Sequence, residues 1–296
     1  MAHLTFIFAP LIKKIMCMKN KKEEVIGLIN NVQDILNKVL AIVDVESEGL
    51  ELNVENPKLD IEKTFQSFFE GESNKQARTA GLSIAEHPDE SKYNPLYVYG
   101  PSGCGKSHLI NAIGVRYKEI NPQKQVLYVT ARQFQMEFTD SVRQNATKDF
   151  INCYQSIDML IVDDIQEWMN APKTLETFFH VFNNLLRNGK QVIFACDRPP
   201  VELQGLEERL LKRFACGLVV ELEKPDMQLC IDFLNAKCHQ SDLKIPSEVI
   251  EFIAKTVNGS IYDLEGVINS LKVYSTVNDS NIGMDIAERI IKRYII

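Results

Sequence analysis

The sequence predicts an α/β protein in which a five-stranded parallel β-sheet is flanked by helices and followed by a small all-helical domain. Three observations lead to this prediction. From Pro95 onward, short apolar strands alternate with helical stretches, which is typical of a parallel sheet with helices on both faces. A glycine-rich turn directly follows the first of these strands. After Lys224-Pro225 the strand pattern stops, and four helical stretches follow.

The composition is that of an ordinary globular protein. Its 296 residues can form one large domain or a medium domain with small additions, and they are 45% hydrophobic and 25% charged. The formal net charge of −7 argues against loose, charge-driven binding to nucleic acid, although a local basic strip is compatible with it. The seven cysteines are scattered along the chain, which favours free thiols in a reducing cytosol over a disulfide framework. With no stretch long enough to span a bilayer, we expect a cytoplasmic protein.

The N-terminal 58 residues are expected to lie outside the α/β domain. Residues 4–12 are apolar, but Lys13 and Lys14 follow them, which is unlike a signal peptide. We expect residues 1–20 to be a disordered leader or an over-extended reading frame, with a start at Met16 or Met18. Within residues 21–58, an amphipathic helix over 21–43 precedes an acidic linker. That helix either packs on the main domain or mediates association.

The strands and helices can be placed from their apolar patterns. The expected strands are residues 96–99, 125–130, 158–164, 191–197 and 217–223. The helices of the second domain are expected near 226–240, 246–257, 261–276 and 283–294, punctuated by Pro246 and Gly259. The domain boundaries are therefore 59–223 for the α/β nucleotide-binding domain and 224–296 for the helical domain.

The turn after the first strand reads Gly-x-x-x-x-Gly-Lys-Ser, the phosphate-binding P-loop. Its glycines allow the backbone N–H groups to approach a polyphosphate, Lys106 can reach the β- and γ-phosphates, and Ser107 can bind Mg²⁺. The bare pattern also occurs by chance, but a strand before it and helical spacing after it favour an ATP site. The residues expected to contact the nucleotide here are Gly100, Pro101, Ser102, Gly103, Cys104, Gly105, Lys106, Ser107 and His108.

Two later strands end in acidic residues. Asp163 and Asp164 follow four apolar residues, the Walker B arrangement, in which Asp163 holds Mg²⁺ and Asp164 orients or deprotonates the attacking water. A helix N-cap would explain one of these acids but not the pair. Asp197 ends the next strand and is placed to position water or sense the γ-phosphate, although an acid after a strand is often a turn residue.

A short helix near residue 210 carries Arg209 and Arg213 on one face. Ion pairs with Glu207 and Glu208 would explain them without a function. The functional interpretation is an arginine finger, Arg213, which stabilises the γ-phosphate of a neighbouring subunit with Arg209 in support. The residues expected to act in hydrolysis are Lys106, Asp164, Asp197 and, in trans, Arg213.

These segments together resemble the AAA+ ATPase core of the DnaA family of bacterial replication initiators. The resemblance runs from about residue 59 to the C-terminus and is carried by residues 102–114, 163–166, 178–183, 197–200 and 208–214, with residues 64–74 similar to the family's entry beside the adenine pocket. It implies a P-loop NTPase of AAA+ type that binds ATP and Mg²⁺ and stacks head to tail. The second domain would be the helical lid.

The resemblance also implies a channel for single-stranded DNA. In the family the connection after the second strand is split into two helices that line this channel, and here it spans residues 131–154. The corresponding cations are Arg132, Arg143, Lys148 and Lys173. A solvated helix face is the alternative explanation for them.

Two departures from the family pattern limit these expectations. Tyr262 stands where the family's lid arginine contacts the γ-phosphate, and it supplies no positive charge. We therefore expect Tyr262 to face the nucleotide, with ATP and ADP bound comparably and hydrolysis slow and assembly-dependent. The chain also ends at Ile296, where the family continues into a helix-turn-helix domain, so sequence-specific binding to duplex DNA is not expected.

The leading functional hypothesis is an ATP-binding initiator of DNA replication that assembles with itself, contacts single-stranded DNA and works with other replication proteins such as DnaA or the helicase. Three alternatives stay open. One is a DnaA paralogue that regulates initiation from the sliding clamp, although no Gln-Leu-x-Leu segment lies near the N-terminus. The others are a helicase or transposase loader and a nucleotide-locked structural module without hydrolysis.

Overall fold

The computed structural model of the chain describes residues 59–88, 93–203, 205–206, 208–257, 259–278 and 282–294. The expected leader (1–20) and the expected helix and linker (21–58) lie outside these residues. Within the described ranges, every helix is too short or too polar to cross a membrane.

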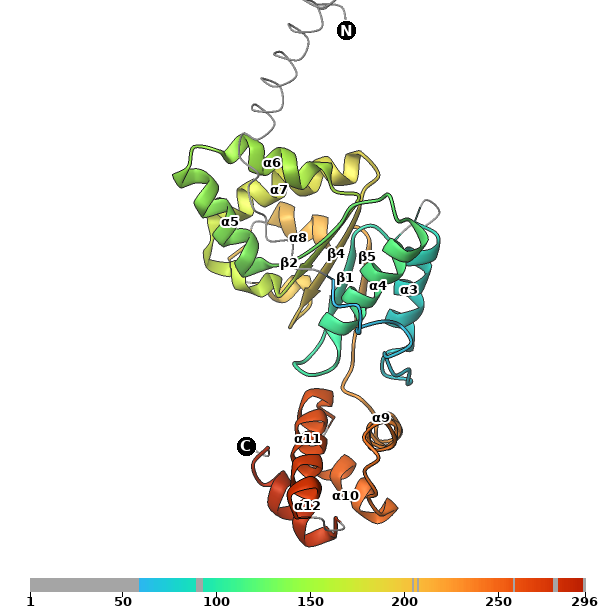
Figure 1. Cartoon of the computed structure of the whole chain (residues 1–296). Coiled ribbons are helices and arrows are strands. Elements are labelled where there is room, and N and C mark those ends of the chain that lie inside the picture. The colour runs from blue at the N-terminus through green and yellow to red at the C-terminus, as the bar shows by residue number, and fades with distance from the viewer. Residues whose placement is uncertain are drawn as a thin grey trace, which may run out of the picture. The chain divides into compact units, whose positions relative to one another are not determined.

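Five parallel strands form a single sheet, as the sequence predicted (Figure 1). They are β1 (Leu96–Tyr99), β2 (Val126–Thr130), β3 (Met159–Asp163), β4 (Gln191–Cys196) and β5 (Leu218–Glu221), arranged in the order β2-β3-β4-β1-β5. Strand β3 ends one residue earlier than expected because Asp164 adopts a left-handed conformation with φ 55°, which turns the chain out of the sheet. Because the five strands are parallel, their carboxyl ends meet at one edge of the sheet, and ligands bind at this edge in open α/β sheets.

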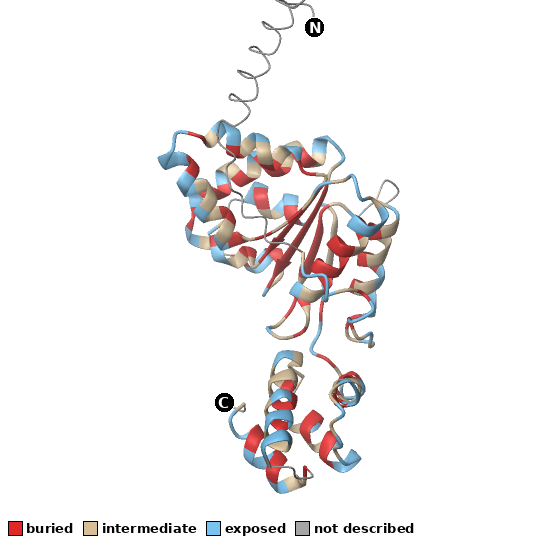
Figure 2. Ribbon diagram, viewed as in Figure 1, coloured by how far each residue is buried: buried red, intermediate tan, exposed pale blue. Residues whose placement is uncertain are grey.

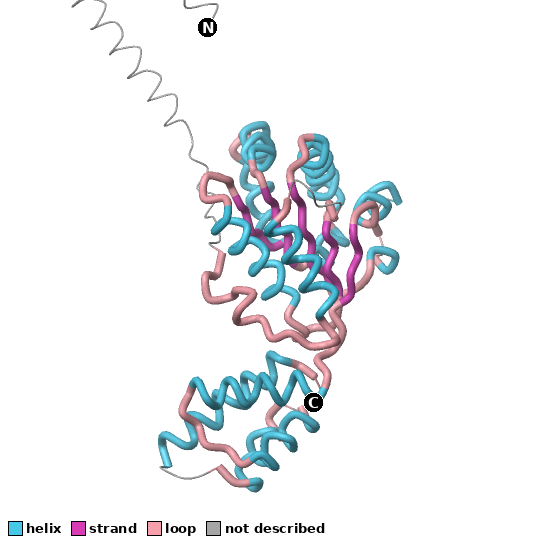
Figure 3. The backbone as a smooth tube through the Cα atoms, turned by 90° about the vertical axis from the view of Figure 1, so that its right-hand side faces the viewer, coloured by secondary structure: helices cyan, strands magenta, loops and turns pink. Residues whose placement is uncertain are grey.

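Helices cover both faces of the sheet (Figures 1 and 3). One face carries α3 (Lys75–Glu86) and α4 (Lys106–Ile120). The other carries α5 (Ala131–Arg143), α6 (Thr147–Ser156), the 3₁₀ helix η1 (Ile165–Asn170), α7 (Pro172–Arg187), the 3₁₀ helix η2 (Pro200–Glu202) and α8 (Glu208–Phe214). The connection after β2 is thus split into two helices, as the resemblance implied.

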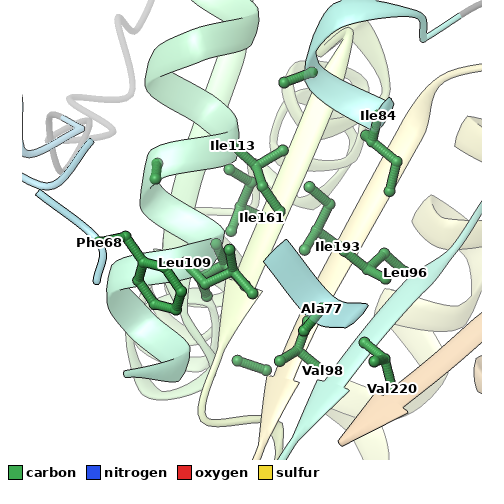
Figure 4. Packing of buried hydrophobic residues seen from close by; sticks show 14 of the residues in the cluster. Phe68, Ala77, Ile84, Leu96, Val98, Leu109, Ile113, Ile161, Ile193 and Val220 are labelled. Carbon is green, nitrogen blue, oxygen red and sulfur yellow. The ribbon is translucent and has the colours of Figure 1, made fainter. Parts of the chain in front are cut away.

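The apolar side chains between the sheet and α3–α4 form one continuous core. Leu109 and Ile113 of α4 and Ile84 of α3 are completely buried against Leu96 and Ile161 of the strands (Figure 4). Burial of such side chains stabilises the fold by about 1.5–3 kcal/mol each relative to full exposure. Strands β3 and β4 are buried along their whole length, while the outer surfaces of the helices are exposed (Figure 2). This core fixes α4, and with it the loop at its N-terminus.

The opposite face of the sheet is packed with aromatic rings. Phe134 of α5 contacts Trp168 of η1 and Phe178 of α7 with ring centroids 5.3 and 5.4 Å apart. Phe194 of β4 contacts Phe214 of α8 at 4.7 Å. Edge-to-face pairs of this kind add about 0.5–1.5 kcal/mol beyond the burial of their area. The indole N–H of the fully buried Trp168 donates to the Ala131 carbonyl at 2.6 Å, so the ring is buried without an unsatisfied donor.

Asp158 connects the amino-terminal ends of strands β2, β3 and β4 through hydrogen bonds. Its carboxylate accepts hydrogen bonds from Lys190, from the Gln125 backbone N–H and from Lys124. Burial alone would raise the pKa of this carboxyl group, but these donors outweigh it and lower the pKa to about 2. Asp158 therefore contributes its stabilisation as a carboxylate.

The C-terminal residues form four helices, as predicted. They are α9 (Met227–Gln240), α10 (Ser247–Thr256), α11 (Ile261–Asn278) and α12 (Met284–Ile291). Helix α9 begins at Asp226, whose side chain accepts from the Leu229 N–H at 2.8 Å. The four helices share their own apolar core, with Leu234, Ile253 and Leu271 completely buried in it. This core is separate from the two at the sheet, which is why the helices can form a domain of their own.

Candidate nucleotide-binding site

The loop between β1 and α4 takes a conformation that only glycine adopts without strain. Gly100 has φ +156°, and a Cβ built on it would lie 2.1 Å from the Leu222 carbonyl oxygen. Gly103 has φ +79°, and its Cβ would lie 2.5 Å from the Ser260 Oγ. Both distances are far below a van der Waals contact, so the two glycines are required by the fold as well as by an approaching phosphate.

Lys106 is the first residue of α4 and is almost completely buried. Its ammonium group donates to the carbonyl oxygens of Gly100 and Pro101, both at 2.9 Å. These two bonds hold the charge inside the loop, where it would meet the β- and γ-phosphates of a nucleotide. Among the other loop residues, Ser102 and Ser107 are exposed and Cys104 is buried. Burial raises the pKa of the Cys104 thiol, which stays protonated at neutral pH.

Asp163 at the end of β3 is only 3% exposed and accepts two hydrogen bonds. The Tyr128 hydroxyl donates to its Oδ2 at 2.6 Å, and the Asp164 backbone N–H donates to its Oδ1 at 2.9 Å. Burial, the Asp163 charge and the hydrogen bond to Asp163 raise the pKa of the Tyr128 phenol. Tyr128 therefore stays protonated and donates to the expected metal ligand at the end of β3.

Gln166 connects the second acidic residue to the neighbouring strand. Its side-chain Nε2 donates to Asp164 Oδ1 at 2.8 Å, and its Oε1 accepts from the Asp197 backbone N–H at 3.3 Å. Gln166 thus holds the Asp164 carboxylate at a fixed place beside the end of β4. The Asp164 carboxylate is partly exposed, so water can reach it.

The Asp197 side chain forms a bidentate ion pair with Arg198, the next residue in the chain. Arg198 Nε and Nη2 donate to the two carboxylate oxygens at 2.7 and 2.8 Å. The Arg198 hydrogen bonds lower the pKa of Asp197, which is a carboxylate at any pH near neutrality. To position water or sense a phosphate, Asp197 would have to share its oxygens with Arg198 or release it.

A pocket beside the loop is lined by the residues expected to border the adenine. It lies between residues 67–74, the phosphate loop, and the first residues of α9 and α11. Phe68 meets His108 edge to face at 5.3 Å, and Phe69 meets Phe233 of α9 at 5.5 Å. The His108 Nε2 lies 3.0 Å from the Thr64 carbonyl oxygen, and burial lowers the pKa of this imidazole. His108 therefore forms the wall of the pocket as a neutral, aromatic side chain.

The start of α11 lies against the phosphate loop. The Ile261 backbone N–H donates to the Gly103 carbonyl at 3.0 Å. The Tyr262 side chain, expected to face the nucleotide, is 79% exposed. It is available to a bound nucleotide or to a neighbouring chain, and it has no positive charge to offer either one.

The two arginines of α8 have different surroundings. The Arg209 guanidinium stacks on the Phe179 ring of α7, 4.7 Å from the ring centroid. Arg209 therefore packs on α7, and its support of Arg213 stays a prediction. Glu208 pairs with Lys212 at 2.6 Å, and Glu207, the other acid of the expected ion pairs, lies outside the described residues. Arg213 is exposed, and no ion pair is found for it in the described part of the chain.

The four cations expected to meet single-stranded DNA are all exposed. Arg132 and Arg143 lie near opposite ends of α5, Lys148 is in the first turn of α6, and Lys173 is in the first turn of α7. Arg143 also forms an ion pair with Asp140 at 3.1 Å. The structure therefore places these residues on the surface of three helices without bonding them to one another in the described ranges.

The donor set at the sheet edge fits Mg²⁺. Ser107 and Asp163 offer a hydroxyl and a carboxylate, the hard oxygen ligands that this ion prefers. Among the described residues, no three His, Cys, Asp or Glu side chains gather into a metal cluster. Mg²⁺ commonly keeps several waters and takes its remaining ligands from nucleotide phosphates.

Sequence reasoning missed two residues of this site. Tyr128 lies two residues before Thr130 in β2, so the two side chains point to the same face of the sheet. Thr130 pairs with Asp163 across the strands, and the alternation of side chains along β2 could therefore have placed Tyr128 on the same face as Asp163. Gln166 stands two residues after Asp164, inside a segment already recognised as part of the resemblance. A polar residue so close to a catalytic acid was the available signal for it.

A P-loop, two acids at the end of β3 and a helical lid on a sheet of order β2-β3-β4-β1-β5 define an AAA+ P-loop protein. The family of the bacterial DnaA ATPase domain matches residues 59–221. The DnaA protein of Bacteroides fragilis (strain YCH46), a chromosomal replication initiator, is 51% identical over 240 residues, which are 81% of this chain and 50% of that protein. The chain belongs to the bacterial DnaA family.

Solved structures agree with this assignment. Domain III of DnaA from Thermotoga maritima superposes with a TM-score of 0.76 at 32% identity, covering 80% of this chain and 99% of that one. A DnaA bound to AMPPCP and single-stranded DNA superposes with a TM-score of 0.70 at 29% identity, covering 79% of this chain and 70% of that one. The chain spans about half the length of the curated relatives it matches.

Proposed function

We propose that this chain is the ATP-binding AAA+ module of a DnaA-type initiator of DNA replication, acting in the cytoplasm. The observation that carries the proposal is the pairing of a glycine-built phosphate loop with two acids at the same sheet edge. Lys106 supplies a buried positive charge for the phosphates, and Asp163 and Ser107 supply oxygen ligands for Mg²⁺. The Mg²⁺ ion would neutralise charge on the β- and γ-phosphates.

Hydrolysis would be slow and would require assembly. Asp164, held by Gln166 at 2.8 Å, is placed to orient the attacking water. The positive charge that would complete the site, Arg213, is exposed and lies on a different helix from every loop residue. A head-to-tail neighbour could therefore supply it in trans. Tyr262 offers no compensating charge, so we expect ATP and ADP to bind with similar affinity.

Contact with single-stranded DNA is the finer part of the proposal. One related DnaA was solved with AMPPCP and single-stranded DNA bound. In this chain the supporting features are the exposed cations of α5, α6 and α7. The exposed face of α5 also carries Met136, which is 58% exposed, at helical spacing from Arg132. An apolar side chain between cations suits a strand whose bases and phosphates are both accessible.

The first test is nucleotide binding by the whole chain. A fluorescent ATP analogue is titrated with Mg²⁺ present, and unlabelled ATP and ADP then compete for the site. Lys106→Ala should abolish binding, whereas Lys118→Ala removes an exposed lysine from the other end of α4 and should not. Loss of binding in neither variant would mean that the nucleotide does not occupy the phosphate loop.

The second test concerns single-stranded DNA. Binding of a labelled oligonucleotide is measured against salt concentration, with ATP and with ADP. Each cation that contacts a phosphate should contribute about 0.7 to the slope of log affinity against log salt. Arg132→Ala and Lys173→Ala should therefore reduce the slope, while Arg187→Ala at the far end of α7 should not. Equal slopes for all three variants would remove these helices as the DNA-binding surface.

A further inference from the structure

Tyr128 stands where β2 can reach the end of β3. Thr130 pairs with Asp163 across the two parallel strands, and Tyr128, two residues earlier, projects from the same face. That face is covered by α4, because Tyr128 packs against the core that α4 shares with the sheet. The Tyr128 side chain thus lies on the α4 side of the sheet and reaches the Asp163 carboxylate.

The phenol is hydrogen-bonded to the carboxylate in a defined direction. Its O–H donates to Asp163 Oδ2 at 2.6 Å, so the proton of this bond comes from the tyrosine and the carboxylate only accepts. Asp163 Oδ1 is fixed separately by the Asp164 backbone N–H at 2.9 Å.

We propose that Tyr128 is a positioning residue for Mg²⁺, which orients the Asp163 carboxylate through this hydrogen bond. The inference rests on the proposed function, since it assigns a role to Tyr128 within the same ATP site. By donating its own proton, the phenol holds the carboxylate in a single orientation. Partners of metal ligands that act in this way commonly change metal affinity 10–100-fold, as an order of magnitude.

The test compares Tyr128→Phe with Tyr154→Phe in the full chain. Both variants remove a hydroxyl that donates to a carboxylate at 2.6 Å, but the Tyr154 partner is Glu137, in the α5–α6 pair. Binding of a fluorescent ATP analogue is first measured in EDTA, which reports an intact phosphate loop without metal. Mg²⁺ is then titrated, and the metal concentration that gives half of the Mg²⁺-dependent change is recorded.

Tyr128→Phe should bind the analogue in EDTA as the wild type does but require about tenfold more Mg²⁺. Tyr154→Phe should match the wild type in both measurements. In an Asp163→Asn background, Tyr128→Phe should have little further effect on the Mg²⁺ requirement, because the carboxylate that the phenol orients has already been removed.

The outcomes separate this inference from the proposed function. An unchanged Mg²⁺ requirement in Tyr128→Phe, with normal binding in EDTA, would overturn the inference and leave the ATP site in place. A full effect of Tyr128→Phe in the Asp163→Asn background would also overturn it, because the phenol would then act without the carboxylate. Failure of the wild type to bind the analogue with or without Mg²⁺ would overturn the proposed function, and the inference with it.

Discussion

Replacing Gly103 by alanine tests the contact between the phosphate loop and the lid. Gly103 has φ +79°, and a Cβ at this position would lie 2.5 Å from the Ser260 Oγ and 3.2 Å from its Cβ. Because real Cβ atoms do not approach so closely, the Ser260 hydroxyl must move. This hydroxyl accepts a hydrogen bond from the Asp263 backbone N–H at 3.2 Å at the start of α11, so that hydrogen bond should be lost with the movement.

Gly189 provides a matched control for the strain at Gly103. Its φ is +67°, and nothing lies within 4 Å of a Cβ built on it. In both variants the left-handed backbone costs alanine about 1–2 kcal/mol of folding free energy. Gly103→Ala should lose roughly a further 1 kcal/mol with the hydrogen bond from Asp263 to the Ser260 hydroxyl. Each kcal/mol lowers the melting temperature by about 2–4 °C for a domain of this size.

The measurements are the melting temperature and the affinity for a fluorescent ATP analogue. Both variants should melt below the wild type, and Gly103→Ala by more. Only Gly103→Ala should weaken nucleotide binding, by about tenfold if about 1.4 kcal/mol of the pocket contacts from the lid are lost. Equal nucleotide affinities in the two variants would refute the reasoning, because the loop would then hold the nucleotide without the lid contact.

Four further predictions follow from the site and the sheet. Gln166→Ala should lower the rate of ATP hydrolysis by more than tenfold, roughly the scale of a misplaced catalytic group, with ATP affinity unchanged; a matching loss of affinity would contradict a positioning role. Arg213→Ala should lose about 10³-fold in the rate of hydrolysis, and mixing it with Lys106→Ala should restore part of the activity if the arginine acts in trans. Tyr262→Arg should favour ATP over ADP in competition binding, and equal competition would show that position 262 does not meet the γ-phosphate. Asp158→Asn should lower the melting temperature at pH 7; because the pKa of Asp158 falls from 3.8 to about 2 on folding, this difference should shrink as the pH falls from about 4 to about 2.

The positions of the strands and of the lid helices could be predicted because their signals are local. A buried parallel strand is a short run of apolar residues, and β3 and β4 are buried along their whole length. The same holds for the phosphate loop, because glycine is the residue that adopts the left-handed conformation found at Gly103 and Gly105 without strain. The ends of the strands were less certain, and the left-handed conformation of Asp164 ended β3 earlier than the apolar pattern did.

The second layer of the site could not be predicted from residue types alone. A tyrosine in a strand indicates only a half-buried surface. Its hydrogen-bond partner depends on the register of β2 and β3, whose paired residues lie 33 positions apart in the chain. The pairing of Thr130 with Asp163 settles that register and brings the Tyr128 hydroxyl to the carboxylate. Gln166 likewise gains its role only because the end of β4 lies beside η1.

The two arginines of α8 separate what the sequence predicts from what the packing adds. Their spacing places Arg209 and Arg213 on the same face of one helix, which the sequence shows without a structure. Both residues are exposed, but the fold brings the Phe179 ring of α7 against the Arg209 guanidinium and gives Arg213 no such contact among the described residues. Helical spacing is fixed by hydrogen bonds four residues apart, whereas the surroundings of a side chain depend on elements that meet only when the sheet and its helices have packed.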